Sequence, residues 1–581
     1  MSSSRKPPIV PVPDMVSAGA DGTERRRFIG GRILYISMLA GMLAVVTAVS
    51  ARGLLALIGL ITNLAFYGRW SWAFVSPAAN TLGPLVILVP IAGAIVVGFM
   101  AYYGSPGIRG HGIPEAMEHV LVNDSRIPPR IVFLKPLSAA LSIGTGGPFG
   151  AEGPVIATGG AMGSVLGQWL PVTVQERKTL LAAGAAAGMA AVFGTPVAAL
   201  LLAVELLLFE WNSRSLVPVA IAVATAATVR IAFVGTLPFF LVPQTTAPAA
   251  WMLLSYAGLG AVVGVVAVAI TRGVYMLEDL FERLPLHWMW WPALGAVGVG
   301  LIGYVAPNTM GVGYANIQSA ISGQVVTAAL LTLMILKCVS WMIALSSGTS
   351  GGTLAPLMTV GACLGALLGR YAAVYYPGLG LNPELTALVA TAAIFAGASR
   401  ALLTSIFFVL ETTWQPAALL PLLIGSGAAY LVSGILMQNT IMTEKIVRRG
   451  VAVPTNYEID TLAQVPVGRI ASKPAVTLSP ESSIASARVL LAQYPYRSFP
   501  LTNAADKLVG CVLAAEIMVV EDSAKPLAEI AHSLISIARN ASVREAVTRL
   551  CRSPAFCLPV VDEAGRVVGV VTQKDIFRAW R

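Results

Sequence analysis

Two long apolar stretches are interrupted by glycine and proline at matching positions. The first runs from Gly144 to Gly167 and the second from Ser346 to Gly369. The second repeats the first at an offset of 202 residues, and the shared positions are Gly150, Pro154, Gly159, Gly163 and Gly167 with Gly352, Pro356, Gly361, Gly365 and Gly369. Matching interrupted segments in two halves of a chain are typical of a transport site built from broken membrane helices.

The composition also indicates a membrane protein, because 56% of the residues are hydrophobic and only 11% are charged, against about 25% charged residues in soluble domains. Apolar runs cover 33–62, 81–103, 131–147, 178–209, 215–235, 250–271, 289–305, 325–346, 354–374, 384–411 and 417–437. Several are too short or too rich in glycine and proline for an upright helix of about 20 residues. We therefore expect an α-helical polytopic protein with tilted and broken helices, in two halves over about 30–235 and 250–446.

The net charge of +10 does not indicate nucleic-acid binding, since the basic residues are scattered and gather beside apolar runs. Such flanks are typical of the cytoplasmic side of a membrane. Residues 1–29 lack a signal-peptide core, and we expect a disordered cytoplasmic tail there. The five cysteines and four histidines show no metal-ligand spacing, so we expect no metal site and no required cofactor.

The motif Gly-His-Gly-Ile-Pro-Glu at 110–115 places two glycines and a proline ahead of a helical pattern. Backbone N–H groups at such a helix start favour an anion, although an ordinary helix-capping loop remains the alternative. The first broken stretch holds a single carboxylate, Glu152, between Gly150 and Pro154. An ionisable group inside a membrane segment indicates function, because burying its charge costs several kcal/mol; an exposed loop glutamate is the alternative.

In the second half Leu354 occupies the position of Glu152, so the halves share architecture but not chemistry. The amides of Thr353 and Leu354 can still donate to an anion. Glu205 and Glu411 end corresponding apolar runs, and for each of them a helix leaving the hydrocarbon is the simplest interpretation.

From about residue 447 the composition becomes that of a soluble domain, with two copies of one unit at an offset of 59 residues, over about 460–520 and 525–581. Each copy is expected to form a helix after an N-cap serine, then strand, turn, strand and helix. The second copy predicts a tight turn at Glu563–Gly565. A repeat this regular predicts a pseudo-symmetric pair with a cleft between its copies.

The motifs at 110–115, 150–154 and 351–356, together with the tail repeat, resemble the prokaryotic type of the CLC family of chloride channels and chloride/proton exchangers, with C-terminal tandem CBS domains. The resemblance implies a homodimer of inverted-repeat subunits, each with its own anion pathway, in the plasma or inner membrane, with both tails cytoplasmic. It implies that Glu152 is the gating residue and that Lys135 favours anions in the pathway. The remaining anion-binding positions that it implies are His111, Gly112, Ala151, Gly153, Thr353, Leu354 and Met442.

Three departures from the family pattern bear on function. His111 replaces the usual serine donor, and Met442 stands where many members have a tyrosine. Leu206 occupies the position of the second glutamate of proton-coupled members, and a leucine cannot relay a proton.

In the tail, Thr572 and Asp575 match nucleotide-contacting positions, whereas the first copy has Leu513 and Glu516. One adenine-nucleotide site at most is expected, and a purely structural tail is the alternative.

These features predict a voltage-gated chloride channel of the CLC type with no enzymatic activity, acting on chloride within the lipid bilayer; a chloride/proton antiporter is the alternative. A cation carrier regulated by the tail would need several intramembrane carboxylates, and the broken stretches offer only Glu152. An intramembrane hydrolase would use Ser346, Ser347 or Ser350 with His111 as base, but no nucleophile motif accompanies them.

Overall fold

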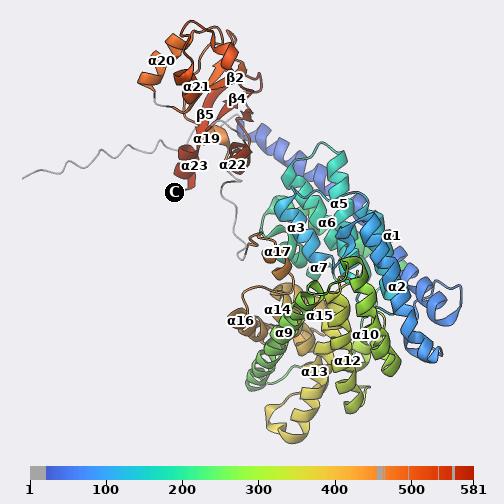
Figure 1. Cartoon of the computed structure of the whole chain (residues 1–581). Coiled ribbons are helices and arrows are strands. Elements are labelled where there is room, and N and C mark those ends of the chain that lie inside the picture. Colours follow the sequence, from blue (N-terminus) through green and yellow to red (C-terminus); the bar gives the residue numbers. More distant parts are fainter. Residues whose placement is uncertain are drawn as a thin grey trace, which may run out of the picture. The chain divides into compact units, whose positions relative to one another are not determined.

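A computed structural model describes residues 21–454, 462, 465–494, 496–533, 535–552 and 556–580. The chain divides into two compact units, Met1–Tyr457 and Glu458–Arg581. Figure 1 shows the larger unit as an assembly of packed helices and the smaller one as a mixture of helices and strands.

The first half of the larger unit comprises helices α1 (Asp21–Tyr67), α2 (Leu88–Phe99), α3 (Ile113–Val122), α4 (Ile131–Gly144), α5 (Glu152–Trp169), α6 (Val174–Phe193), α7 (Pro196–Leu202) and α8 (Ser213–Val234). The second half comprises α9 (Leu253–Glu282), α10 (Trp291–Val305), α11 (Tyr314–Ile321), α12 (Thr327–Ser346), α13 (Leu354–Tyr375), α14 (Pro383–Ser399), α15 (Leu402–Thr413), α16 (Leu419–Leu436) and α17 (Glu444–Arg448). A π-helical turn, Ala203–Leu208, continues α7.

The repeat seen in the sequence is a repeat of structure. Helices α5 and α13 begin at Glu152 and Leu354, which are equivalent positions of the two broken stretches. Helix α5 packs against α6 as α13 packs against α14. A Cβ at Gly159 would lie only 2.2 Å from the Gly184 carbonyl oxygen of α6, so the helix pair depends on small residues for its close packing, as is usual in membrane bundles.

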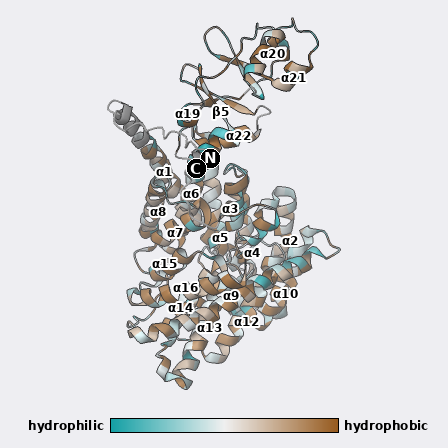
Figure 2. Ribbon diagram, turned by 90° about the vertical axis from the view of Figure 1, so that its left-hand side faces the viewer, coloured by the Kyte–Doolittle hydropathy of each residue, from teal (hydrophilic) through white to brown (hydrophobic). Residues whose placement is uncertain are grey.

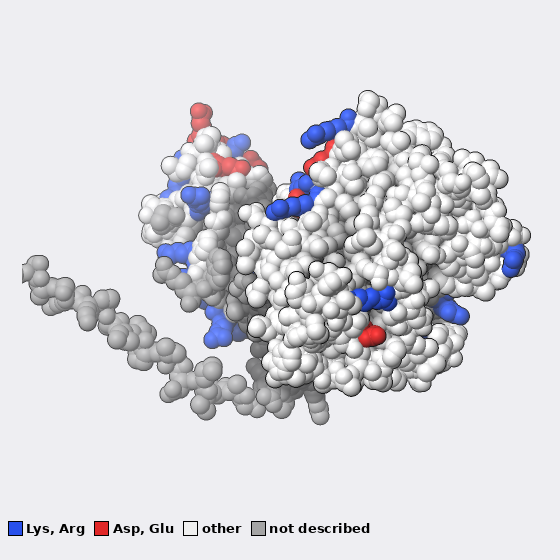
Figure 3. All heavy atoms as spheres, turned by 90° about the horizontal axis from the view of Figure 1, so that it is seen from below, with Lys and Arg blue, Asp and Glu red and all other residues white. Residues whose placement is uncertain are grey.

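Among the described residues, eight helical segments are long and apolar enough to cross a membrane. Hydrophobic residues dominate these helices in Figure 2, and Figure 3 shows a broad face with few charged side chains. The predicted run 178–209 breaks at Gly194, as expected from Gly194-Thr195-Pro196. The run 384–411 is also divided into two helices, because Arg400 adopts a left-handed φ of 58° and ends α14. The sequence did not indicate this division.

We predicted a disordered tail over 1–29. Residues 1–20 lie outside the described residues, and α1 begins at Asp21. The segment from Asp21 to Arg27 contains glutamate and three arginines, and residues of these types favour helix, so the apolar helix extends into the charged segment.

The smaller unit contains α19 (Val467–Ile470), α20 (Ile484–Gln493), β1 (Ser498–Thr502), β2 (Leu508–Leu513), α21 (Ala514–Val519), β3 (Ile537–Ala538), α22 (Val543–Arg552), β4 (Cys557–Val561), β5 (Val567–Thr572) and α23 (Gln573–Trp580). Strands β1 and β2 are antiparallel, and so are β4 and β5, which are their counterparts in the second copy of the repeat. The expected order of elements is confirmed. Ser483 caps α20 by accepting a hydrogen bond from the Ser486 N–H, and the predicted tight turn has Gly565 at φ 78°.

Candidate functional site

Three loops that precede helices meet inside the larger unit. The Gly150 N–H donates to the Gly352 carbonyl (3.1 Å), and the Gly352 N–H donates to the Gly150 carbonyl (2.9 Å). Gly110 joins them, because its N–H donates to Thr349 and its carbonyl accepts from the Gly351 N–H. The N-termini of α3, α5 and α13 therefore converge on one region. Each contributes the backbone N–H groups of a helix start and the positive end of a helix dipole, which together suit an anion.

Two glycines make this convergence possible. Gly112 adopts a φ of 95°, and a Cβ there would lie 2.5 Å from the Gly153 carbonyl oxygen. A Cβ on Gly153 would lie 1.9 Å from the His111 carbonyl oxygen. The loop before α3 and the start of α5 thus touch backbone to backbone, and any larger residue would push them apart.

The loop before α3 is further held by Glu115. Its Oε2 accepts the Gly112 N–H (2.7 Å), and its Oε1 accepts from Lys445 Nζ (3.0 Å) at the start of α17. The motif at 110–115 therefore forms the helix-capping loop that was the alternative interpretation of it. The same loop also lies beside the start of α5, so capping and an anion site are compatible.

Glu152 is the first residue of α5 and is only 1% exposed. Its Oε1 accepts a hydrogen bond from the Tyr314 hydroxyl (3.1 Å). A Cβ at Gly352, in the second broken stretch, would lie 3.0 Å from Glu152 Oε2. The side chain that the sequence singled out is therefore buried where the two broken stretches meet, and it is not an exposed loop glutamate.

The other predicted anion-binding residues lie in the same buried region or beside it. Ala151, Thr353, Leu354 and Met442 are fully buried, and His111 is 5% exposed. Within the described part of the chain, three buried side-chain atoms of this region have no hydrogen-bond partner: His111 Nδ1, Glu152 Oε2 and Thr353 Oγ1. Because unpaired buried polar atoms are rare in proteins, these groups mark a place that fits a small polar or ionic ligand.

Lys135 is buried in α4, and its Nζ donates to the carbonyls of Ile108 and Gly110, both at 2.8 Å. It therefore places a positive charge directly behind the loop that carries His111. A second buried lysine, Lys337 of α12, is its counterpart in the second half and donates to the carbonyls of Thr309 and Gly311. Sequence reasoning missed Lys337, although the offset between the two broken stretches also relates Lys135 to Lys337 and would have identified it.

Leu206 is buried in the turn that follows α7, with 4% exposed. For its neighbour Glu205 the sequence favoured a helix leaving the hydrocarbon, and the structure adds a bonding role that the sequence did not indicate. Glu205 is 6% exposed, and it accepts hydrogen bonds from the N–H groups of Leu403 and Thr404 and from the Thr404 hydroxyl. This carboxylate caps α15, because capping satisfies free amides at a helix start.

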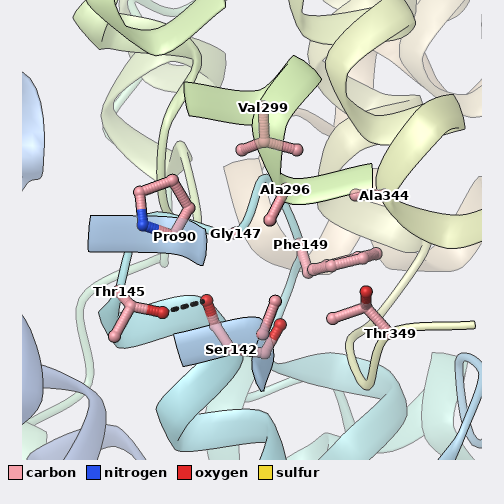
Figure 4. A pocket seen from close by; sticks show the side chains of 10 residues that line it. Pro90, Ser142, Thr145, Gly147, Phe149, Ala296, Val299, Ala344 and Thr349 are labelled. Carbon is pink, nitrogen blue, oxygen red and sulfur yellow. Dashed lines mark hydrogen bonds between the residues drawn. The ribbon is translucent and has the colours of Figure 1, made fainter. Parts of the chain in front are cut away.

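A small cavity of about 20 Å³ lies beside Phe149, three residues before Glu152. Figure 4 shows Ser142, Thr349 and Phe149 around it, with Thr145 bonded to the Ser142 carbonyl. This volume holds about one water molecule, provided that polar partners line it. Ser142 and Thr349 supply such partners next to the buried carboxylate region.

The serines of the hydrolase alternative are bonded elsewhere. Ser346 donates to the Val274 carbonyl, Ser347 donates to the Ala344 carbonyl, and Ser350 accepts from Ser138. These hydroxyls belong to helix ends and loop contacts. The geometry thus provides no support for a serine and His111 acting together.

In the smaller unit, Thr572 and Asp575 lie together at the start of α23. Asp575 Oδ2 accepts from the Thr572 N–H (2.8 Å) and the Thr572 hydroxyl (2.7 Å), and its Oδ1 accepts from the Ser472 hydroxyl (2.9 Å). The first copy has Glu516 at the matching position, paired with His532 at 2.8 Å. Both carboxylates are thus already bonded by side chains of their own unit.

Comparison with known proteins identifies the family. The family model for the voltage gated chloride channel matches residues 92–434, which is more than half of the chain. The chain belongs to this family. The model for the CBS domain matches residues 467–521 and 527–581 of the smaller unit.

Relatives of the family agree. A putative chloride channel protein ClcB-like from Ralstonia nicotianae is 27% identical over 351 residues, covering 60% of this chain and 82% of that protein. The H(+)/Cl(-) exchange transporter ClcA of Salmonella arizonae is 30% identical over 421 residues, covering 68% and 88%. Anion transport is therefore the activity that the chain shares with this family.

Solved structures show the same fold. A slow cyanobacterial Cl-/H+ antiporter aligns with a TM-score of 0.64 at 23% identity, covering 71% of this chain and 98% of that chain. A eukaryotic CLC transporter aligns over 94% and 98% with a TM-score of 0.62 at 20% identity. The second alignment spans both units, which confirms the predicted fold class.

Proposed function

We propose that this protein is a chloride/proton antiporter in which Glu152 gates the anion path. The observation that carries the proposal is the burial of the Glu152 carboxylate where three helix N-termini converge. An anion and the ionised Glu152 side chain compete for the same amides, so protonation of Glu152 or its displacement by chloride opens the path. Each cycle thus moves a proton together with the swing of the side chain.

This proposal replaces the channel that we favoured from Leu206. Support comes from the exchange activity named for a relative that is 30% identical. Leu206 is buried and carries no proton, so protons must reach Glu152 without it. The unpartnered His111 Nδ1 and the water-sized cavity beside Phe149 are the candidate steps of such a route.

The roles of the remaining residues follow from their positions. His111, with a buried and unpartnered Nδ1, and the amides of Thr353 and Leu354 bind chloride beside the carboxylate. Lys135 stabilises the anion from behind the loop. We extend the proposal to a homodimer in a cell membrane, with the CBS pair on the cytoplasmic side, where positively charged flanks are retained.

The test uses proteoliposomes loaded with chloride, with the external pH recorded while chloride leaves. Exchange predicts that protons enter the vesicles as chloride leaves, so the external medium becomes alkaline. Glu152→Ala is expected to keep chloride flux and to abolish proton movement. Chloride flux from the wild type with no proton movement would establish a channel instead, and an absence of anion flux would contradict both assignments.

A further inference from the structure

The Glu152 carboxylate has a second-half partner that the sequence did not indicate. The Tyr314 hydroxyl donates to Glu152 Oε1 at 3.1 Å. Tyr314 is the first residue of α11, 162 positions further along the chain. A hydroxyl that donates to an ionised carboxylate forms a charge-assisted bond, which is stronger than a neutral one.

The ring of Tyr314 is fixed by aromatic neighbours. Its centroid lies 5.1 Å from the ring of Phe239 and 5.8 Å from that of Phe193, both edge to face. Phe74 stacks at 6.5 Å. Edge-to-face and offset contacts of this kind orient a ring. The hydroxyl therefore points to Glu152 in a set direction.

The backbone that carries Tyr314 is also fixed. Gly311 and Gly313 adopt φ values of 67° and 81°, so the chain turns sharply before α11. The buried Lys337 Nζ donates to the carbonyls of Thr309 (2.9 Å) and Gly311 (2.8 Å) within this turn. Lys337 thus anchors the turn from which the tyrosine projects.

The same arrangement occurs in the first half of the chain. There Lys135 holds the turn of Gly110 and Gly112, which also have positive φ, and Ile113 opens α3. Ile113 is thus the first-half counterpart of Tyr314, because each is the first residue of the helix that follows the turn. The two halves build equivalent turns, but the first residue of the following helix is isoleucine in the first half and tyrosine in the second. The tyrosine hydroxyl is the group that reaches the Glu152 carboxylate.

We propose that Tyr314 is a positioning residue that holds the Glu152 carboxylate in the anion path. This inference rests on the gating role proposed above for Glu152. Chloride must break the tyrosine bond before it takes the place of the carboxylate. The bond raises the fraction of molecules in which the carboxylate occupies the anion site, and the apparent chloride affinity falls accordingly. A cavity of about 40 Å³, large enough for a water molecule, is lined by Tyr314, Ser76 and Asn316.

The test is chloride binding to the purified full chain, measured by titration calorimetry. Tyr314→Phe keeps the ring and its packing and removes only the hydroxyl. The loss of one charge-assisted bond is expected to tighten chloride binding about tenfold. In a Glu152→Ala background, the same substitution is expected to have no effect. Tyr67→Phe is the matched control, because it removes a hydroxyl bond to the Ser76 carbonyl and is expected to leave binding unchanged.

Two results would overturn this inference alone: unchanged chloride binding in Tyr314→Phe, or the same change in the presence and absence of the carboxylate. The second result would mean that the hydroxyl acts on the anion or on the fold instead of Glu152. Wild-type chloride binding together with wild-type proton movement in Glu152→Ala would overturn the gating role, and this inference with it. The two failures are therefore distinguishable.

Discussion

Glu205 and Glu411 each cap the first turn of a helix in the opposite half of the chain. Glu205 Oε1 and Oε2 accept the N–H groups of Leu403 and Thr404, both at 2.9 Å, at the start of α15. Glu411 lies in α15 itself and accepts the N–H groups of Val197 (3.0 Å) and Ala198 (2.9 Å) at the start of α7. The reciprocal bonds join the two halves at their equivalent helices.

The first prediction concerns the stability of this pair. Glu205→Gln presents an amide NH₂ to two N–H donors in a buried place, and we expect a loss of about 1.5–3 kcal/mol, the usual value of a hydrogen bond to a charged group. Thermal unfolding of the purified protein measures it. Glu384→Gln is the control, because Asn382 rather than Glu384 caps α14. Equal melting of Glu205→Gln and the wild type would mean that the caps carry no net stability.

The second prediction concerns pH. Acid protonates the Glu152 carboxylate, which then no longer competes with chloride for the amides, so chloride flux through the wild type is expected to rise as the pH falls. Glu152→Gln cannot ionise, and its flux is expected to be high and flat over the same range. Fluxes from proteoliposomes at several pH values test this. A Glu152→Gln variant that retains the wild-type pH dependence would assign the gate to another group.

The third prediction concerns Lys135. Lys135→Met removes a buried charge and its two bonds to the carbonyls behind His111, and we expect chloride to bind about tenfold more weakly. Lys178→Met is the matched control, because its Nζ donates to the Leu208 carbonyl (2.6 Å), outside the converging loops. Calorimetric titration measures the chloride affinity of both variants. If Lys135→Met binds chloride as tightly as Lys178→Met, Lys135 only supports the fold.

The fourth prediction concerns the nucleotide. The Ser472 hydroxyl donates to one oxygen of Asp575, so it would compete with a ribose hydroxyl for this carboxylate. If the second CBS copy binds an adenine nucleotide, Ser472→Ala is expected to bind ADP more tightly than the wild type, and Asp575→Ala is expected to lose binding. Titration of ADP into the full-length protein measures both. No binding by the wild type or by Ser472→Ala would favour the purely structural tail.

The sequence predicted features that depend on repetition and on special backbone. The match between the two broken stretches located the starts of α5 and α13. Tyr314 was not predicted, because an aromatic residue in an apolar chain resembles core and only the fold brings it to Glu152.

The capping bonds of the two glutamates were not predicted, for a similar reason. Glu205 and Glu411 end apolar runs, and neither run indicates a partner for the carboxylate. Their partners lie in the other half of the chain, far away in sequence. Contacts between distant segments leave no local pattern, so sequence alone could not supply them.

The last prediction concerns the turn between β4 and β5. The Arg566 N–H is the largest cause that holds the pKa of Asp562 below its usual range; the Arg566 guanidinium and the Ala564 N–H add to it. A lowered folded-state pKa means that the ionised carboxylate favours the folded state. This contribution is present above the ordinary pKa of about 4 for aspartate, and it is lost as the pH falls through the lower folded-state value.

Hydrogen exchange of the β4 and β5 amides, corrected for intrinsic rates, should therefore show greater protection in the wild type than in Asp562→Asn at pH 7, with the difference narrowing below about pH 4. If the difference in protection between the wild type and Asp562→Asn stays constant with pH, the asparagine side chain fails to replace the carboxylate because of its shape and not because of its charge.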